Sequence, residues 1–316
     1  YWDISPWFTS SIYFGLVFVF AMNRSKIMNI LGKILTPAII LILIFVIGIT
    51  IFSYPFEFGT TTIASPFTNG ILEGYQTFDA IGAVVVGGVI IISINIKHKT
   101  ASYTDKKSLI RNAGWLAGLA LFLIYMGLIL SGALSHSVFD ADTTRTTLLS
   151  GLAINSLGNV GNLFLSILVG IACFTTAVGI VTGTADFVRS RFNDSQSAYN
   201  ITAVIGSVLG VLMGQFNVGY IIAIALPSLM FIYPITIILI LLNVVPEKYA
   251  SSLVFKTVTI ATILFSVPDF LGSISAIAPA TDAFSWIPLQ QYSLGWVLPA
   301  LLVFILTNIF TKAKSA

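Results

Sequence analysis

The chain has 316 residues, of which 57% are apolar and only 9% are charged, with a formal net charge of +3 at pH 7. A soluble domain carries about 25% charged residues, so this composition excludes a water-soluble globule. The apolar runs are too long and alternate too little for a membrane β-barrel, and no basic cluster is interleaved with aromatics to bind nucleic acid. We therefore expect an all-α integral membrane protein.

Nine apolar runs are candidates to cross a bilayer, which takes about 17–25 helical residues. In chain order they are Pro6–Met22, Thr36–Phe52, Asp79–Ile96, Ala113–Leu134, Asn162–Thr184, Ile201–Gln215, Tyr220–Val244, Val258–Leu271 and Ser293–Phe310. Ser5-Pro6 and Thr36-Pro37 each place a cap residue before a proline, a pair that favours a helix start. The sixth and eighth runs are short, and their ends are the least defined.

Loop charge predicts the orientation. With the N-terminus outside, fourteen of the fifteen lysines and arginines fall in inner loops, and only Arg145 lies outside. This asymmetry satisfies the positive-inside rule, and it predicts a cytoplasmic C-terminus. The chain starts at Tyr1 without a methionine or a charged signal-peptide region. An outside N-terminus then predicts that an odd number of upstream helices is missing and that the chain is an N-terminally truncated fragment.

Two outer segments are predicted to be short helices rather than simple loops. Ser65-Pro66 supplies a cap and a first helical residue, and Phe67–Gln76 is too short to span a membrane. We interpret it as a half-helix. A second short helix is predicted at Thr146–Leu157.

The segment Leu72–Ala80 is the most informative stretch of the chain. It places two carboxylates, an amide, two hydroxyls and a glycine before the apolar run Ile81–Ile96. Such an interruption persists where the backbone of a membrane helix lines a cavity, and in transporters broken helices build the substrate and ion site. Gly74 permits backbone conformations that a helix disfavours, and Asp79 is placed to cap the next helix. The alternative is an ordinary interfacial loop followed by a capped helix.

A second set of polar groups lies in the fifth apolar run, at Gly170–Gly179. The adjacent hydroxyls of Thr175 and Thr176, among small residues, offer oxygen ligands to a small cation. The alternative is purely structural, because membrane threonines often donate to their own i−4 carbonyl and small residues ease helix packing.

The remaining features argue against chemistry in the membrane. No histidine lies within a predicted span and no nucleophile–base cluster occurs at membrane depth, so the chain is not predicted to be an enzyme. The single cysteine, Cys173, excludes an intrachain disulfide, and we expect it to be a buried packing residue. Gly206, Gly210 and Gly214 predict a face for close helix packing.

At Gly74–Ala80 and Ala172–Gly179 the chain resembles the branched-chain amino acid:cation symporters, the carriers of bacterial branched-chain amino acid transport system II. Asn23-Arg24-Ser25-Lys26 with Ile34-Leu35-Thr36-Pro37, and Leu226-Pro227 through Tyr233-Pro234, agree with this resemblance. It runs along essentially the whole chain.

The resemblance implies a sodium-symporter-like helical bundle with two inverted five-helix repeats and twelve spans. This chain would hold about nine of them, equivalent to helices 4–12, as a single transmembrane domain over residues 1–316. Residues 1–53 would end the first repeat, 64–244 would form the second, and 245–316 would add two C-terminal helices. The missing N-terminal helices of the same protein, one of them broken, would be its partners.

The resemblance also implies the site residues. The amino-acid pocket would be lined by Gly74, Tyr75, Gln76 and Thr77, with Asp79 shaping the break or taking part in coupling. Gln76 and Phe78 stand where relatives carry leucine and methionine. The carbonyl of Ala172 and the hydroxyls of Thr175 and Thr176 would face the cation.

We expect secondary active import of leucine, isoleucine and valine, coupled to Na⁺ or H⁺, by alternating access in the bacterial cytoplasmic membrane and among its lipids. No cofactor is expected, and no metal other than the transported cation. Weak selectivity among the three substrates is expected, because one methylene changes the binding free energy in an apolar pocket by only about 1–3 kcal/mol. Two alternatives are another amino-acid or cation symporter of the same fold, and a transport-incompetent membrane fragment with a structural role. We expect the 316-residue chain alone to give no gradient-driven leucine uptake.

Overall fold

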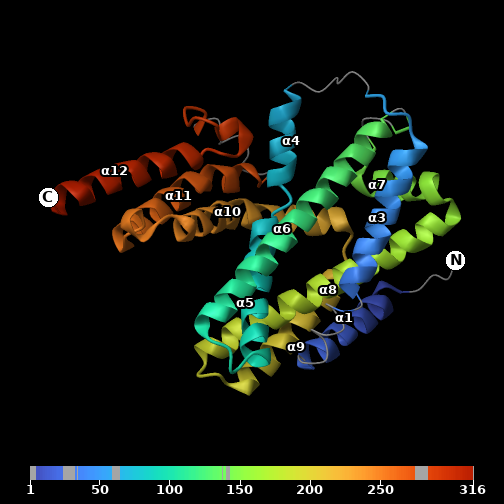
Figure 1. Cartoon of the computed structure of the whole chain (residues 1–316), viewed down its shortest axis with the longest axis horizontal. Helices are drawn as coiled ribbons and strands as arrows, with labels where there is room; N and C mark the ends of the chain where they lie inside the picture. Colours follow the sequence, from blue (N-terminus) through green and yellow to red (C-terminus); the bar gives the residue numbers. More distant parts are fainter. Residues whose placement is uncertain are drawn as a thin grey trace. The chain divides into compact units, whose positions relative to one another are not determined.

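A computed structural model describes residues 5–23, 33, 35–58, 65–136, 138–139, 143–274 and 284–315. Over these residues the chain is helical and has no β-strand (Figure 1). In chain order the α-helices are α1 (Pro6–Met22), α3 (Thr36–Ser53), α4 (Pro66–Tyr75), α5 (Asp79–Lys97), α6 (Tyr103–Leu134), α7 (Arg145–Leu157), α8 (Asn159–Arg191), α9 (Gln196–Met213), α10 (Val218–Val244), α11 (Ser252–Gly272) and α12 (Val297–Ser315). Arg24, Ser25, Lys26 and Ile34, which belong to the family-like motifs, lie outside the described residues.

The helices begin where prolines were predicted to start them, but not through side-chain caps. Ser5 precedes α1 without a side-chain capping bond, and its carbonyl accepts from the N–H of Phe8 at 3.0 Å. The prediction of Thr36 as a cap is wrong, because Leu35 precedes α3 in a helical conformation and Thr36 is already helical. The N–H groups of the first turn have no partner within the helix, and proline lacks this group. Proline is therefore tolerated both as the first residue of α1 and as the second residue of α3.

Several helices extend beyond their predicted apolar runs, and α6 and α8 extend furthest. α6 begins at Tyr103 rather than at the predicted Ala113. Ser102 and Asp105 form a capping box, in which the N–H of Asp105 donates to Ser102 Oγ at 3.2 Å and the N–H of Ser102 donates to Asp105 Oδ2 at 3.3 Å. A cap fixes a helix start wherever it occurs, whereas an apolar run marks only the part suited to a membrane. α8 likewise continues to Arg191, past the predicted Thr184.

The chain divides into two compact units, and each is described by itself. The first lies within Tyr1–Ala64 and Val85–Leu212, and the second within Ser65–Val84 and Met213–Ala316. The division of the sequence into inverted repeats stays a prediction.

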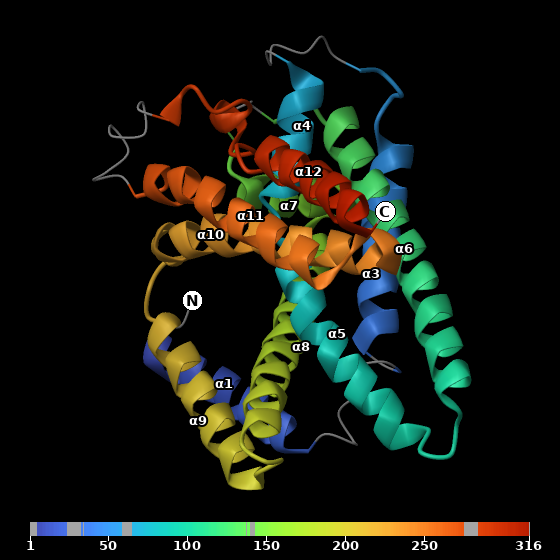
Figure 2. The ribbon, with the colours of Figure 1, turned by 90° about the vertical axis from the view of Figure 1, so that its left-hand side faces the viewer.

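The first unit has a core where α1, α8 and α9 meet (Figure 2). Its buried members are Val17, Ala21, Val178, Val181, Ala185, Tyr199 and Ala203. The hydroxyl of Tyr199 donates to the carbonyl of Ala21 at 2.6 Å and ties α9 to the end of α1. Gly210 of α9 lies so close to Phe14 of α1 that a methyl group there would overlap the ring. This contact agrees with the predicted packing role of that glycine.

The second unit is built on α10, α11 and α12, with α4 and the start of α5 (Figures 1 and 2). α11 packs between α10 and α12. The buried members of its core are Ile238, Leu242, Val254, Val258, Trp296 and Ala300, and Tyr75 packs against them. Pro227 and Pro234 lie inside α10, as predicted for that span, and Pro268 lies inside α11.

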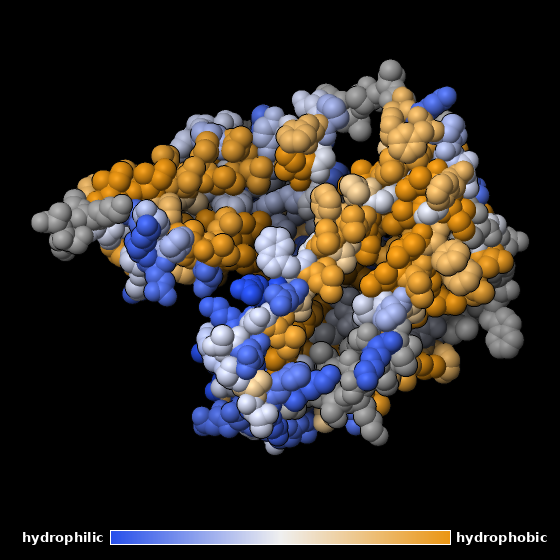
Figure 3. All heavy atoms as spheres, in the orientation of Figure 1, coloured by the Kyte–Doolittle hydropathy of each residue, from blue (hydrophilic) through white to orange (hydrophobic). Residues whose placement is uncertain are grey.

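The surface is apolar in the manner of a membrane protein. Apolar residues cover much of the visible faces of α3, α12 and the C-terminal part of α6 (Figure 3), and Phe52, Phe67 and Trp115 are 93%, 82% and 78% exposed. Among the described residues, seven helices are long and apolar enough to cross a membrane, and Pro6–Met22 and Val297–Thr311 are shorter apolar helices. The architecture is that of an integral membrane protein, and nine as the number of spans stays a prediction.

Candidate functional site

The predicted interruption is present between α4 and α5. α4 ends at Tyr75, α5 begins at Asp79, and Phe78 between them adopts a left-handed conformation with φ of 54°. The interruption lies within the predicted segment Gly74–Asp79, but the expected role of Gly74 as its non-helical residue is wrong, because Gly74 lies inside α4 and only Phe78 in this segment has a positive φ. A left-handed residue just past the last turn is the usual way to end a helix, and here a non-glycine residue occupies it.

Thr77 closes the turn that ends α4. The carbonyl of Gly74 accepts from the Thr77 N–H at 3.3 Å and from Thr77 Oγ1 at 2.9 Å. The carbonyl of Tyr75 accepts from the N–H of Phe78 at 3.4 Å. The backbone of the break is therefore held by its own short hydrogen bonds, and the Thr77 hydroxyl oxygen keeps its acceptor lone pairs for another group.

Aromatic side chains hold the break against two other helices. Tyr233 of α10 makes edge-to-face contacts with Tyr75 and Phe78, with ring centroids 4.9 and 5.0 Å apart. The indole Nε1 of Trp296, just before α12, donates to the Tyr75 hydroxyl at 3.3 Å. Edge-to-face pairs of this kind contribute about 0.5–1.5 kcal/mol each beyond their buried area. The end of the half-helix is thus fixed by α10 and by the start of α12.

The other predicted pocket residues lie at the surface of the second unit. Gly74, Gln76, Thr77 and Asp79 are exposed, whereas Tyr75 is partly buried. Asp79 is the first residue of α5, where a carboxylate interacts favourably with the positive end of the helix dipole. The structure therefore brings these five residues together on one short segment, with Tyr75 alone among them packing into the core.

The predicted cation ligands lie on one turn of α8 in the first unit. Thr175 Oγ1 and Thr176 Oγ1 both donate to the carbonyl of Ala172, at 2.8 and 2.9 Å. Hydroxyls that donate to a carbonyl of their own helix are the purely structural alternative to a cation site. This arrangement leaves the lone pairs of both hydroxyl oxygens available, although the Ala172 carbonyl already accepts two hydroxyl donors. Cys173 is exposed on this turn rather than buried, because an apolar run does not specify which side of a membrane helix packs against protein.

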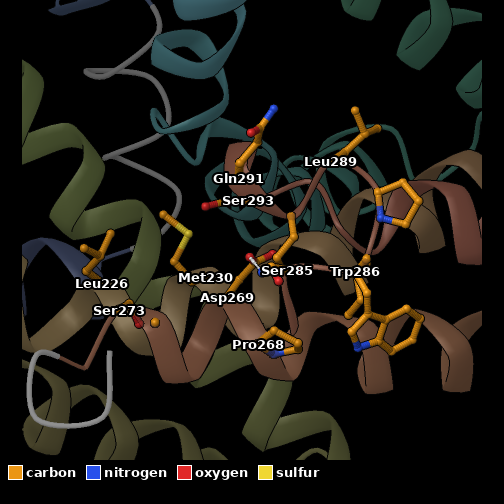
Figure 4. A pocket seen from close by; sticks show the side chains of 14 residues that line it. Leu226, Met230, Pro268, Asp269, Ser273, Ser285, Trp286, Leu289, Gln291 and Ser293 are labelled. Atoms are coloured by element: carbon orange, nitrogen blue, oxygen red, sulfur yellow. Dashed lines mark hydrogen bonds between the residues drawn. The ribbon is translucent and has the colours of Figure 1, made fainter. Parts of the chain in front are cut away.

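Sequence reasoning missed a buried polar pair in the second unit. Asp269, near the end of α11, is 7% exposed and accepts from Gln290 Nε2 at 2.6 Å. Gln290 begins the 3₁₀-helix η4 (Gln290–Tyr292). Both line a cavity of about 670 Å³ (Figure 4). The signal was available, because Asp269 interrupts the predicted span Val258–Leu271 and an ionisable residue inside a span is a functional candidate.

The contacts of Tyr233 and Trp296 were also missed. Tyr233 lies in the predicted motif Leu226-Pro227 through Tyr233-Pro234, but an apolar run gives no indication of which aromatic faces a break more than 150 positions away in sequence. Trp296 lies 221 positions from its partner Tyr75.

Comparison with known proteins gives one consistent family. The family described as "Branched-chain amino acid transport protein" matches residues 5–314. The "Branched-chain amino acid transport system 2 carrier protein" of Pseudomonas aeruginosa is 30% identical over 93% of this chain and 67% of its own length. The "Branched-chain amino acid permease BraB" of Bacillus subtilis is 30% identical over 95% and 68%, and the permease BrnQ of Corynebacterium glutamicum is 28% identical over 92% and 66%.

The chain therefore spans about two thirds of the length of these relatives. No solved structure matches it.

Proposed function

This chain belongs to the family of branched-chain amino acid transport proteins, and we propose that it carries leucine, isoleucine and valine across the membrane. The family and the relatives are transport proteins, not enzymes, and the chain is a multi-pass membrane protein. The proposal extends the substrate named for the relatives to this chain.

The observation that carries the proposal is the interrupted helix α4–α5. A break in a membrane helix frees backbone groups and a helix N-terminus, which together bind the charged ends of an amino acid. We assign Gly74, Tyr75, Gln76, Thr77 and Asp79 to this region of the substrate site. The positive end of α5 attracts the substrate carboxylate, but the carboxylate of Asp79 would repel it unless Asp79 turned away or paired with the substrate ammonium group. We therefore propose that Asp79 faces the ammonium group.

The aromatic cluster supports an apolar substrate. Tyr75, Phe78, Tyr233 and Trp296 offer ring faces and edges beside the break, with the hydroxyls of the two tyrosines and the indole N–H of Trp296 as the polar groups among them. Apolar walls with a few placed polar groups are typical of small-molecule sites. Such walls distinguish leucine, isoleucine and valine weakly, because these substrates differ by a methylene or its position.

Coupling to a cation is the second part of the proposal. We assign the Ala172 carbonyl and the hydroxyls of Thr175 and Thr176 to the cation site, with Na⁺ or H⁺ as the coupling ion. Oxygen ligands of this kind suit a hard cation, and hydroxyls that donate to their own helix are held in fixed directions. Transport would follow alternating access around a site at the repeat interface, with residues 64–244 as the second repeat.

We further propose that the protein lies in the bacterial cytoplasmic membrane with Tyr1 on the outer side and the C-terminus in the cytoplasm. The support is the position of the lysines and arginines, of which all but Arg145 fall in loops on one side.

The experiment that tests the substrate is competitive uptake. Cells expressing the complete gene are given labelled leucine with an excess of unlabelled isoleucine, valine, alanine or proline. We expect isoleucine and valine to suppress uptake strongly and alanine and proline to leave it unchanged. Suppression by alanine or proline to the same extent would instead indicate another amino-acid symporter.

A further inference from the structure

Asp269 presents a buried carboxylate oxygen without a hydrogen-bond donor. Its Oδ1 accepts from Gln290 Nε2 at 2.6 Å, whereas its Oδ2 is buried and has no partner among the residues that the structure describes. Gln290 Oε1 is buried and unpartnered in the same sense. An unsatisfied buried acceptor destabilises the folded protein, and more strongly when it is charged. Asp269 and Gln290 thus bring two unpartnered acceptors into one hydrogen-bonded pair, which a hydrogen-bond donor or a cation would stabilise.

These groups lie in the wall of a cavity. The cavity has a volume of about 670 Å³, within the range of about 300–1,000 Å³ that is usual for small-ligand sites. Figure 4 shows Asp269 between Met230 and Ser285, and Ser273 and Ser293 line the same space. The two residues that carry the unpartnered oxygens therefore line a space with room for a ligand, together with serines that carry further oxygen atoms, while the two oxygens themselves are buried in its wall.

The backbone around Gln290 is built to hold its amide in place. Leu289 before η4 and Ser293 after it both adopt left-handed conformations, with φ of 66° and 54°. Left-handed conformations are strained for residues other than glycine, and such strained residues tend to cluster at ligand sites. A methyl group at Gly295 would overlap Gln290 Oε1 in its present position, so the glutamine amide lies directly against the backbone of Gly295.

The charge of the pair selects the kind of ligand. One carboxylate and one neutral amide carry a single negative charge, and a monovalent cation neutralises it without leaving a buried net charge. Over the described part of the chain, no group of three or more histidine, cysteine, aspartate and glutamate residues gathers as a multivalent metal would need. Hard oxygen ligands favour a hard cation.

We propose that Asp269 and Gln290 bind a small monovalent metal cation, in a site distinct from the one assigned to Thr175 and Thr176. Asp269 Oδ2 and Gln290 Oε1 are the protein ligands of this cation. The serines that carry further hydroxyls line the same cavity as these two residues. The site does not depend on the proposed transport activity, because none of the observations that support it concerns the break between α4 and α5 or the threonines of α8.

The test is binding of radioactive sodium to the purified protein, at constant pH and at constant ionic strength kept with choline. We expect Asp269→Asn, which keeps the size of the side chain and removes its charge, to bind one sodium ion fewer per chain than the wild type. Glu247→Gln is the matched control, because it removes one carboxylate from an exposed turn in the same unit. It should bind as many ions as the wild type.

A second variant keeps the result decisive if Asp269→Asn does not fold. Gln290→Met keeps the approximate length of the side chain but removes the whole amide, both its ligand oxygen and the Nε2 that donates to Asp269 Oδ1. It should weaken sodium binding by about tenfold or more, the effect of at least one lost charge-assisted contact. Size-exclusion profiles identify the folded variants. The proposal is overturned if the folded Asp269→Asn protein binds as much sodium as the wild type, or if Gln290→Met leaves the affinity unchanged. Leucine uptake is measured separately, so a failure of this site and a failure of the transport proposal give different results.

Discussion

Trp296 donates a hydrogen bond from its indole Nε1 to the hydroxyl of Tyr75 at 3.3 Å, so the start of the last helix is joined to the end of the half-helix. Tyr75 also packs edge-to-face on Tyr233. These contacts reach the break from α10 and from the start of α12, which lie far from it in sequence. The conformation of the break is therefore set by tertiary contacts as much as by its own turn.

Replacing Trp296 by phenylalanine should weaken substrate transport without unfolding the protein. The smaller phenyl ring keeps part of the packing, but the Tyr75 hydroxyl loses its donor, a change of about 0.5–1.5 kcal/mol. We expect the rate of leucine uptake at low concentration to fall about two- to tenfold. Trp115→Phe, at a position 78% exposed on α6, is the control and should leave uptake unchanged. Equal uptake by both variants would contradict a positioning role for Trp296.

The left-handed conformation of Phe78 predicts an unusual order of stability among its variants. Phe78→Gly and Phe78→Val both lose the ring contact with Tyr233, but only valine is strained at φ of 54°. A left-handed conformation costs a side-chain-bearing residue about 1–2 kcal/mol, so the valine variant should melt at a lower temperature than the glycine variant. A valine variant as stable as the glycine variant would show that the turn is not left-handed at this position.

Sequence reasoning located the helices well because apolar runs and prolines act locally. α1 has the predicted bounds, and the half-helix α4 and the outer helix α7 are present. The start of α6 was missed because the capping box of Ser102 and Asp105 lies outside the apolar run. An apolar run indicates where a membrane-crossing stretch lies, whereas a polar cap that precedes the run in the chain decides where the helix begins.

The site was predicted only in part, since its contacts are not local. The interruption could be predicted because polar residues there precede an apolar run. That Phe78 rather than Gly74 departs from the helical conformation could not, because it depends on which hydrogen bond is the last of the helix. The aromatic partners of Tyr75 and the amide partner of Asp269 come from distant segments. No periodicity in the sequence links such pairs.

The glycines of α9 give a matched test of packing. Gly210→Ala would place a methyl group against the ring of Phe14, whereas at Gly206 the nearest atom is Val181 Cγ2 at 3.5 Å, an ordinary contact. We expect Gly210→Ala to destabilise the protein by about 1–3 kcal/mol through overpacking. Gly206→Ala should be neutral, or stabilising by about 0.5–1 kcal/mol because alanine favours the helix. Thermal unfolding in detergent compares them, and an equal effect at both positions would contradict the close α1–α9 contact.

The proposed cation ligands are tested by removing one hydroxyl at a time. Thr176→Val keeps the shape of the side chain and removes an oxygen ligand, so the cation concentration for half-maximal uptake should rise about tenfold, the effect of roughly 1.4 kcal/mol. Thr202→Val is the control, because the Thr202 hydroxyl donates to the Ala198 carbonyl at 2.8 Å in the same way but on α9. If both variants need the same cation concentration as the wild type, Thr176 is a structural residue.

The most direct test of the account is leucine accumulation in proteoliposomes that hold the product of the complete gene. Leucine is supplied outside under an inward Na⁺ gradient, under an inward H⁺ gradient, and with both gradients dissipated. The account predicts accumulation above equilibrium under one of the two gradients and its loss when that gradient is removed. Leucine entry that is the same under all three conditions, or no entry at all, would contradict cation-coupled transport of branched-chain amino acids.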